Sequence, residues 1–270
     1  MPERAELRVT SSDGTRISAW RTGTGPNLLL VHGTAADHTR WARISTLWEH
    51  QLTVYAMDRR GRGGSGDASA YSLEREADDV CAVAEALPGP CTILGHSYGA
   101  ICCLEAAPRL TNLHRLILYE PPLPGGQPIV PIEARELLDR LIGHGEREAA
   151  LLAFFREIVR LPEDQIARLR ANSAWQKRVD AAHTIPREIR VEDLYRPDFD
   201  RIHSIRTETL LLLGGDSPRF FHAAIDRLNQ ALPNSRTHVF PGQQHVAMDT
   251  VPDEFARIVS AFVLNAQPYG

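Results

Sequence analysis

The sequence predicts an α/β protein built on a doubly wound sheet. Short, continuous apolar segments such as residues 27–31 indicate strands that are covered on both faces. Helical patterns alternate with these segments, which implies right-handed β-α-β crossovers. The alternation fails between Pro121 and Arg206, where only helical patterns occur. That stretch therefore indicates a helical insertion between two halves of the α/β core.

The elements of the core follow in order along the chain. Residues 5–9 and 16–21, on either side of Asp13-Gly14, predict a β-hairpin. Apolar segments predict strands at 27–31, 52–57, 92–94, 115–119 and 209–213, with a weaker candidate at 236–240. Helical patterns cover 37–48, 73–87, 98–107, 218–232 and 252–264. Start signals support two of these helices, Ser72 before one and Ser217-Pro218 before another.

The insertion is expected to form a cap over the carboxyl ends of the strands. A proline- and glycine-rich linker at 121–128 precedes helical patterns at 132–142, 146–161 and 162–175. We expect residues 1–121 and 207–270 to form the core and residues 122–206 to form the cap. Apolar side chains crowd the second cap helix, Phe154 and Phe155 among them. Such an apolar stripe is typical of a helix face that packs into a hydrophobic core, and some of these side chains could also line a pocket.

Composition limits the classes of function. With 270 residues, 43% of them hydrophobic and 24% charged, the chain is a folded globular protein. A net charge of −4 argues against nucleic-acid binding. The chain contains no apolar run of membrane-spanning length, and we expect no secretory signal, because the first residues lack a basic segment followed by an apolar stretch. The four cysteines match neither a zinc nor a redox motif, so we expect buried thiols in a reducing cytoplasm.

A candidate nucleophile lies in Gly95-His96-Ser97-Tyr98-Gly99, which fits G-x-S-x-G. An apolar strand leads into the motif and a helix of small residues leads out, as a nucleophile elbow requires. We expect Ser97 at positive φ, with Gly95 and Gly99 allowing neighbouring backbone to approach closely. Ser97 then lies at a helix N-terminus, where the dipole favours developing negative charge.

A serine nucleophile requires a general base and a group that orients the base. Of the eleven histidines, His245 follows the last predicted strand in a loop at the carboxyl end of the sheet. We expect His245 to be the base. For the acid we favour Asp216, which follows strand 209–213, with Glu120 at the end of strand 115–119 as the alternative. Asp249 is too close to His245 in sequence to be favoured.

The oxyanion of such a reaction needs two N–H donors. One is the backbone N–H of Tyr98, which follows the nucleophile. The second is expected from the loop after strand 27–31, with the N–H of Thr34 as the candidate.

A second motif, Gly61-Arg-Gly-Gly-Ser-Gly66, fits G-x-G-x-x-G, the dinucleotide-binding pattern. Its glycines neither adjoin the preceding strand nor open the next helix, so a pyrophosphate would lack its helix N-terminus. We therefore expect a turn tied down by Asp58 and the arginines, and no cofactor. No spacing of His, Cys and carboxylates suggests a metal.

Taken together, these motifs resemble the α/β-hydrolase superfamily. The resemblance rests on His32-Gly33, on Asp58 to Ser65, on the Ser97 motif, on Gly214-Gly-Asp216 and on Gly242-Gln-Gln-His245. It implies an eight-stranded, mostly parallel sheet with helices on both faces, and no cofactor. Ser97 stands where haloalkane dehalogenases and epoxide hydrolases have aspartate, and His32-Gly33-Thr34 differs from the His-Gly-Gly-Gly of hormone-sensitive-lipase-like esterases.

The resemblance implies a small bacterial-type hydrolase of a carboxylic ester, lactone or thioester. Two alternatives remain open because fold does not dictate chemistry. One is a C–C bond hydrolase, lyase or cyclase on the same fold. The other is a receptor that senses a small molecule without turnover. In each case we expect a small-molecule ligand and no nucleic acid or membrane partner; the sequence gives no indication of the oligomeric state.

Overall fold

The computed structural model describes residues 5–124, 129–172 and 174–265. It contains an eight-stranded sheet in the order β1-β2-β4-β3-β5-β6-β7-β8. The first two strands form an antiparallel hairpin at one edge. The other strands, β3 to β8, are parallel to one another. The expected α/β-hydrolase architecture, with a mostly parallel eight-stranded sheet, is confirmed.

The strands are short, and those at the centre are buried along their whole length. Every residue of β3, β4, β5 and β7 is buried, as expected for parallel strands covered on both faces. The strands are β1 (Ala5–Thr10), β2 (Arg16–Gly23), β3 (Asn27–Val31), β4 (Thr53–Asp58), β5 (Cys91–His96), β6 (Leu113–Tyr119), β7 (Thr209–Gly214) and β8 (Ser235–Phe240).

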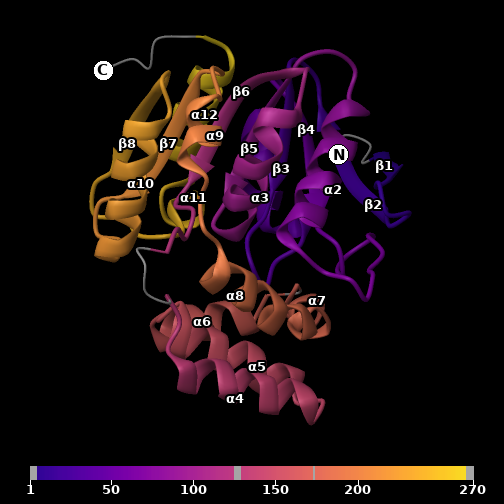
Figure 1. Ribbon diagram of the computed structural model, residues 1–270, viewed down its shortest axis with the longest axis vertical. Helices are drawn as coiled ribbons and strands as arrows, with labels where there is room; N and C mark the ends of the chain where they lie inside the picture. The colour runs from indigo at the N-terminus through magenta and orange to yellow at the C-terminus, as the bar shows by residue number, and fades with distance from the viewer. Residues whose placement is uncertain (1–4, 125–128, 173, 266–270) are drawn as a thin grey trace.

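Helices cover both faces of this sheet (Figure 1). On one face, α2 (Leu73–Glu85), α3 (Tyr98–Ala106) and α10 (Arg219–Ala231) enclose an apolar core with the sheet. On the other face, α1 (Ala42–Trp48), α11 (Ala247–Thr250) and α12 (Pro252–Val263) enclose a second core. A 3₁₀ turn, His38–Trp41, replaces the first part of the helix expected at 37–48. Asp37 caps this turn by accepting a hydrogen bond from the N–H of Thr39.

Between β6 and β7 the chain leaves the sheet and forms a helical lobe, which we define as α4 to α8. Figure 1 shows the lobe beyond one end of the sheet. The lobe has its own apolar cluster, to which Phe154 and Phe155 contribute. Its helices are α4 (Ile132–Gly143), α5 (Arg147–Ala153), α6 (Glu163–Arg170), α7 (Trp175–Asp180) and α8 (Ile185–Leu194).

The lobe departs from the sequence expectation in three places. The helix expected at 146–161 is α5 followed by a π-helical turn, Phe154–Ile158. The pattern at 162–175 gives only α6, and the helices that follow it were not expected. The last of these, α9 (Phe199–His203), contacts α10 of the core rather than the lobe. Residues 125–128 of the expected linker and residue 173 lie outside the described residues.

Within the described part of the chain, no helix is long and apolar enough to span a bilayer.

Candidate active site

Ser97 lies on a tight turn between β5 and α3, as the sequence predicts. Its backbone has φ 55° and ψ −127°, a strained conformation for a residue with a side chain. A methyl group on Gly95 would lie 2.5 Å from the Cα of Ala100, and one on Gly99 would lie 2.4 Å from the carbonyl oxygen of Val31. The glycines are therefore required by close backbone contacts. Tyr98 is the first residue of α3, so its N–H has no partner within the helix.

His245 is oriented by a buried carboxylate. Its Nδ1 donates to Oε2 of Glu120 at 2.6 Å. The other oxygen of this carboxylate, Oε1, accepts hydrogen bonds from the N–H of Gly214 and from the hydroxyl of Ser217, each at 2.6 Å. Glu120 is completely buried, and these donors satisfy both of its oxygens. Because Nδ1 is held by Glu120, Nε2 is the nitrogen left with a lone pair to accept a proton.

The expectation that Asp216 contacts His245 is not what the structure shows. Asp216 is exposed, and its carboxylate makes no hydrogen bond or ion pair among the described residues. The backbone N–H of Asp216 donates to the carbonyl of Gln243, in the loop that leads to His245. The end of β7 lies so close to that loop that a methyl group on Gly214 would lie 2.6 Å from the Gln243 carbonyl. Glu120, the alternative considered from the sequence, occupies the position on Nδ1.

The neighbouring parallel strands β5 and β6 bring Ser97 and Glu120 together at the carboxyl end of the sheet. The N–H of Ser97 donates to the carbonyl of Tyr119, the residue before Glu120, at 2.9 Å. Glu120 also has a positive φ, 45°, and Ala35 after β3 has φ 56°. These three strained residues lie just beyond the carboxyl ends of β3, β5 and β6. Such strain tends to gather at functional sites.

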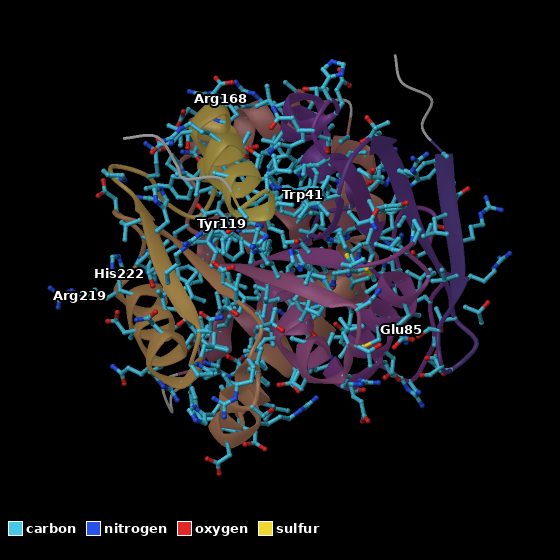
Figure 2. The ribbon with its side chains drawn as sticks, turned by 90° about the horizontal axis from the view of Figure 1, so that it is seen from above. Trp41, Glu85, Tyr119, Arg168, Arg219 and His222 are labelled. Carbon is cyan, nitrogen blue, oxygen red and sulfur yellow. The ribbon has the colours of Figure 1, made fainter. Side chains whose placement is uncertain are left out.

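The loop that carries His245 is held by Tyr119. The Tyr119 hydroxyl donates to the carbonyl of Gln244 at 2.5 Å and accepts from the N–H of Ala247 at 3.0 Å. Phe221 stacks on the imidazole of His245 with ring centroids 4.6 Å apart. Figure 2 shows Tyr119 in the interior of the molecule, whereas Arg219 and His222 lie at its outer edge. The imidazole is thus fixed by hydrogen bonds and by packing.

The loop after β3 runs against the serine. A methyl group on Gly33 would lie 2.9 Å from the Cβ of Ser97 and 3.5 Å from its Oγ. Thr34 follows Gly33, which is where the second oxyanion donor was expected. His32 holds the loop by donating from Nδ1 to the carbonyl of Gly33 at 2.8 Å and accepting from the N–H of Arg59 at Nε2.

Two further histidines of the site are neutral and structural. Burial and the nearby Arg62 and Arg59 hold the pKa of His32 well below its usual range. Burial and the nearby His245 have the same effect on the pKa of His96. The Nε2 of His96 donates to the carbonyl of His245 at 2.9 Å. Both rings therefore position backbone near Ser97 and do not compete with His245 for a proton.

A buried ion network lies behind the Tyr98 ring and joins the core to the helical lobe. Arg59 lies over the Tyr98 ring at 4.4 Å and binds Glu76 through two hydrogen bonds. The same guanidinium is 3.2 Å from Glu188 of α8, which also accepts from Arg62. All four charged side chains are fully buried. Although burial opposes it, the two arginines hold the pKa of Glu188 below its usual range.

The glycine-rich stretch at 61–66 forms a turn on Asp58, as expected. The N–H of Gly64 donates to Oδ2 of Asp58 at 2.9 Å, and the Ser65 hydroxyl donates to its carbonyl at 2.6 Å. A methyl group on Gly63 would lie 2.2 Å from this carboxylate. Helix α2 begins only at Leu73, so the glycines do not open a helix.

Within the described ranges, one cluster has a metal-like composition: Asp37, His38 and Asp58. His38 Nδ1 already lies 2.8 and 2.9 Å from the two oxygens of Asp58. Trp20 Nε1 donates to Oδ2 of the same carboxylate at 2.9 Å. These bonds use the Asp58 oxygens and the His38 nitrogen that a cation would need, so the residues do not fit a metal site.

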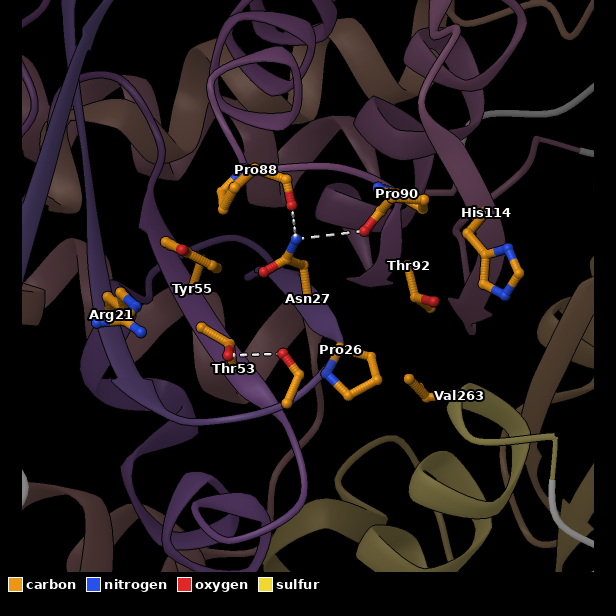
Figure 3. A pocket seen from close by; sticks show the side chains of 11 residues that line it. Arg21, Pro26, Asn27, Thr53, Tyr55, Pro88, Pro90, Thr92, His114 and Val263 are labelled. Carbon is orange, nitrogen blue, oxygen red and sulfur yellow. Dashed lines mark hydrogen bonds between the residues drawn. The ribbon is translucent and has the colours of Figure 1, made fainter.

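A surface pocket of about 450 Å³ lies at the opposite end of the sheet (Figure 3). It is lined by residues at the amino ends of the strands, such as Asn27 and Thr53. Asn27 donates to the carbonyls of Pro88 and Pro90 there. Ligands of open parallel sheets bind at the carboxyl ends, so this pocket is separate from the Ser97 site.

Comparison with known proteins gives a consistent picture. The model of the family described as "Alpha/beta hydrolase family" matches residues 28–258. The crystal structure of an alpha/beta hydrolase from Sphaerobacter thermophilus superposes with a TM-score of 0.81 and 33% identity, covering 95% of this chain and 99% of that chain.

Two curated relatives match over nearly the whole chain at lower identity. The chain is 26% identical to the 2-hydroxy-6-oxo-2,4-heptadienoate hydrolase of Pseudomonas putida, covering 95% of each protein. It is 27% identical to the pimeloyl-[acyl-carrier protein] methyl ester esterase of Aeromonas hydrophila, covering 92% of this chain and 99% of the esterase. A shorter match, 36% identity over 100 residues, spans only 17% of the probable oxidoreductase EphD of Mycobacterium tuberculosis.

Proposed function

The chain belongs to the alpha/beta hydrolase family, and from this premise we propose that it hydrolyses a small carboxylic ester, lactone or thioester through an acyl-enzyme on Ser97. One observation carries the proposal: the buried Glu120 holds the imidazole of His245, and both lie at the same carboxyl end of the sheet as the strained Ser97 turn. This arrangement supplies a nucleophile, a base and a group that orients the base.

The proposed reaction begins with attack of Ser97 Oγ on the substrate carbonyl carbon. His245 Nε2 takes the hydroxyl proton as the new C–O bond forms. Glu120 keeps the proton on Nδ1 and stabilises the imidazolium. The developing oxyanion is bound by the N–H groups of Tyr98 and Thr34, and the helix N-terminus at α3 favours the same charge.

In the second part of the reaction, the imidazolium gives its proton to the leaving alcohol or thiol, and the acyl-enzyme remains. A water molecule then attacks the acyl carbon while His245 takes a proton from it. Collapse of the second tetrahedral intermediate releases the carboxylic acid and returns the proton to Ser97. No step requires a redox partner.

The printed name of the Aeromonas relative, a methyl ester esterase, supports ester chemistry. The Pseudomonas relative supports a second candidate, because the oxo-dienoate in its name carries a ketone and no ester, so that its hydrolysis breaks a C–C bond. The two candidates use the same Ser97 and His245. A panel of short esters, lactones and thioesters, run beside oxo-dienoates, separates them by which class turns over.

The direct test of the proposal is covalent labelling by a fluorophosphonate probe. We expect wild-type protein to be labelled and Ser97→Ala to be unlabelled. Ser45→Ala of α1 is the matched control and should be labelled as strongly as wild type. Absence of labelling in folded wild-type protein, or equal labelling in Ser97→Ala, would refute the serine-hydrolase assignment.

A further inference from the structure

Ala35 connects the proposed oxyanion loop to the helical lobe. It follows Thr34, is completely buried and has φ 56°, a left-handed conformation that is unfavourable for alanine. Its side chain belongs to the apolar cluster of the lobe, together with Leu151, Ala182 and Ile185. A residue of the core loop is thus packed inside the lobe, and the lobe helps to hold its strained conformation.

Arg178 of α7 binds this residue from the lobe side. Its Nη1 donates to the carbonyl of Ala35 at 2.6 Å. This is the one hydrogen bond of Arg178 among the described residues, and no carboxylate oxygen there lies within 4.0 Å of its guanidinium. Burial and the nearby Arg40 lower the pKa of Arg178 to about 10, which leaves it protonated at neutral pH. The carboxylates of Asp37 and Asp249 act on this cation from beyond 4.0 Å, so the Ala35 carbonyl is its one direct polar partner among the described residues.

We propose that Arg178 is a positioning residue for the oxyanion hole; this inference rests on the proposed function. By holding the Ala35 carbonyl, Arg178 fixes the left-handed residue that follows Thr34 and thereby fixes the direction of the Thr34 N–H. Gly33, on the other side of Thr34, is already held against Ser97. Turnover therefore depends on the helical lobe being docked on the core, because the lobe supplies the group that orders the loop.

The expected effect falls on the chemical step. A displacement of about 1 Å at a catalytic group costs on the order of 100-fold in rate. Loss of an oxyanion donor costs about 100- to 1000-fold in kcat. Arg178→Met removes the donor but keeps an apolar stem, so we expect kcat for p-nitrophenyl acetate to fall about 10- to 100-fold. KM should change by less than about threefold, because ground-state binding does not use the oxyanion donors.

Two variants complete the set. Arg178→Lys keeps a cation and a donor, and its kcat should lie between those of wild type and Arg178→Met. Arg168→Met removes an exposed arginine of the same lobe that pairs with Asp164 four positions earlier, and it should match wild type. All rates are divided by the folded fraction measured by circular dichroism, so that partial unfolding does not count as lost chemistry.

A trifluoromethyl ketone, which forms an oxyanion on the nucleophilic serine, provides an independent readout. Its inhibition constant should rise in Arg178→Met by about the factor by which kcat falls, an effect that a purely structural role would not produce. Unchanged kcat in folded Arg178→Met, equal kcat in the Met and Lys variants, or a slower variant with an unchanged inhibition constant would each overturn the inference.

If folded wild-type protein is not labelled by the fluorophosphonate, the proposed function fails and this inference fails with it. If wild type is labelled and Arg178→Met is labelled equally fast, only the inference fails.

Discussion

Glu120 and His245 are joined by a 2.6 Å hydrogen bond, although 125 positions separate them in the sequence. Glu120 lies directly after β6, and His245 lies in the loop after β8. The bond spans β7, whose last residue, Gly214, donates its N–H to the other oxygen of Glu120. The carboxylate therefore ties the ends of the last strands together as well as orienting the imidazole.

The close contacts at the serine turn predict that Gly95→Ala destabilises the protein. The added methyl group would lie 2.5 Å from the Cα of Ala100, which is backbone and cannot move aside. Overpacking of this kind costs about 1–3 kcal/mol. We expect Tm to fall by at least about 2 °C in a thermal melt. Gly143→Ala, where nothing lies within 4 Å, is the control and should leave Tm unchanged or slightly higher; equal melting of the two variants would contradict the packing argument.

The buried ion network predicts a large cost for Glu188→Gln. This substitution leaves the guanidinium groups of Arg59 and Arg62 without one of their carboxylates in the interior. Removal of one partner from a buried ion pair costs about 3–5 kcal/mol. We expect the urea midpoint to fall clearly, and protease cleavage within the helical lobe to become faster. Glu163→Gln, which breaks an exposed ion pair with Arg156, should change neither; an unchanged midpoint in Glu188→Gln would show that the network does not stabilise the fold.

Glu192 predicts a fall in stability with rising pH. Burial, together with the nearby Glu188 and Asp193, raises the pKa of Glu192 from 4.5 to about 8. Between these two values the folded protein holds a proton that the unfolded chain has released. The free energy of unfolding therefore decreases as pH rises from 4.5 to 8, by roughly 1.4 kcal/mol per pH unit from this group alone.

Glu192→Gln removes this titration, so we expect its stability to change less than that of wild type between pH 5 and pH 8. Urea denaturation at each pH measures the difference. Glu136→Gln, on an exposed position of α4, should follow the wild-type curve. If Glu192→Gln and wild type lose stability in parallel over this range, the raised pKa is wrong.

The sheet and the serine turn were predictable because local sequence determines them. Continuous apolar segments identify parallel strands, and the glycines around Ser97 reflect backbone contacts within one β-turn-α unit. The helices α7 and α8 were not predicted. Three of the six buried residues of α8 are acidic, namely Glu188, Glu192 and Asp193, and Glu188 pairs with Arg59 of the core. An apolar periodicity therefore cannot reveal this helix.

The choice between Asp216 and Glu120 could not be made from the sequence. Both carboxylates follow a buried strand at the carboxyl end of the sheet, so both satisfied the same criterion. What separates them is three-dimensional: Glu120 adopts φ 45° and points beneath the His245 loop, whereas Asp216 turns outward to solvent. Arg178 was missed for the same reason, because its contact with Ala35 joins residues 143 positions apart.

We propose that Glu120, and not Asp216, orients His245 for proton transfer from Ser97. The most direct measurement is kcat for a short ester in Glu120→Gln and in Asp216→Asn. By analogy with serine proteases, in which loss of the orienting carboxylate costs about 10⁴-fold, Glu120→Gln should lose several orders of magnitude in kcat. Asp216→Asn should stay within about threefold of wild type, because its carboxylate is exposed and makes no hydrogen bond or ion pair with a described residue. Near wild-type kcat in folded Glu120→Gln, with a large loss of kcat in Asp216→Asn, would show that Asp216 is the orienting carboxylate.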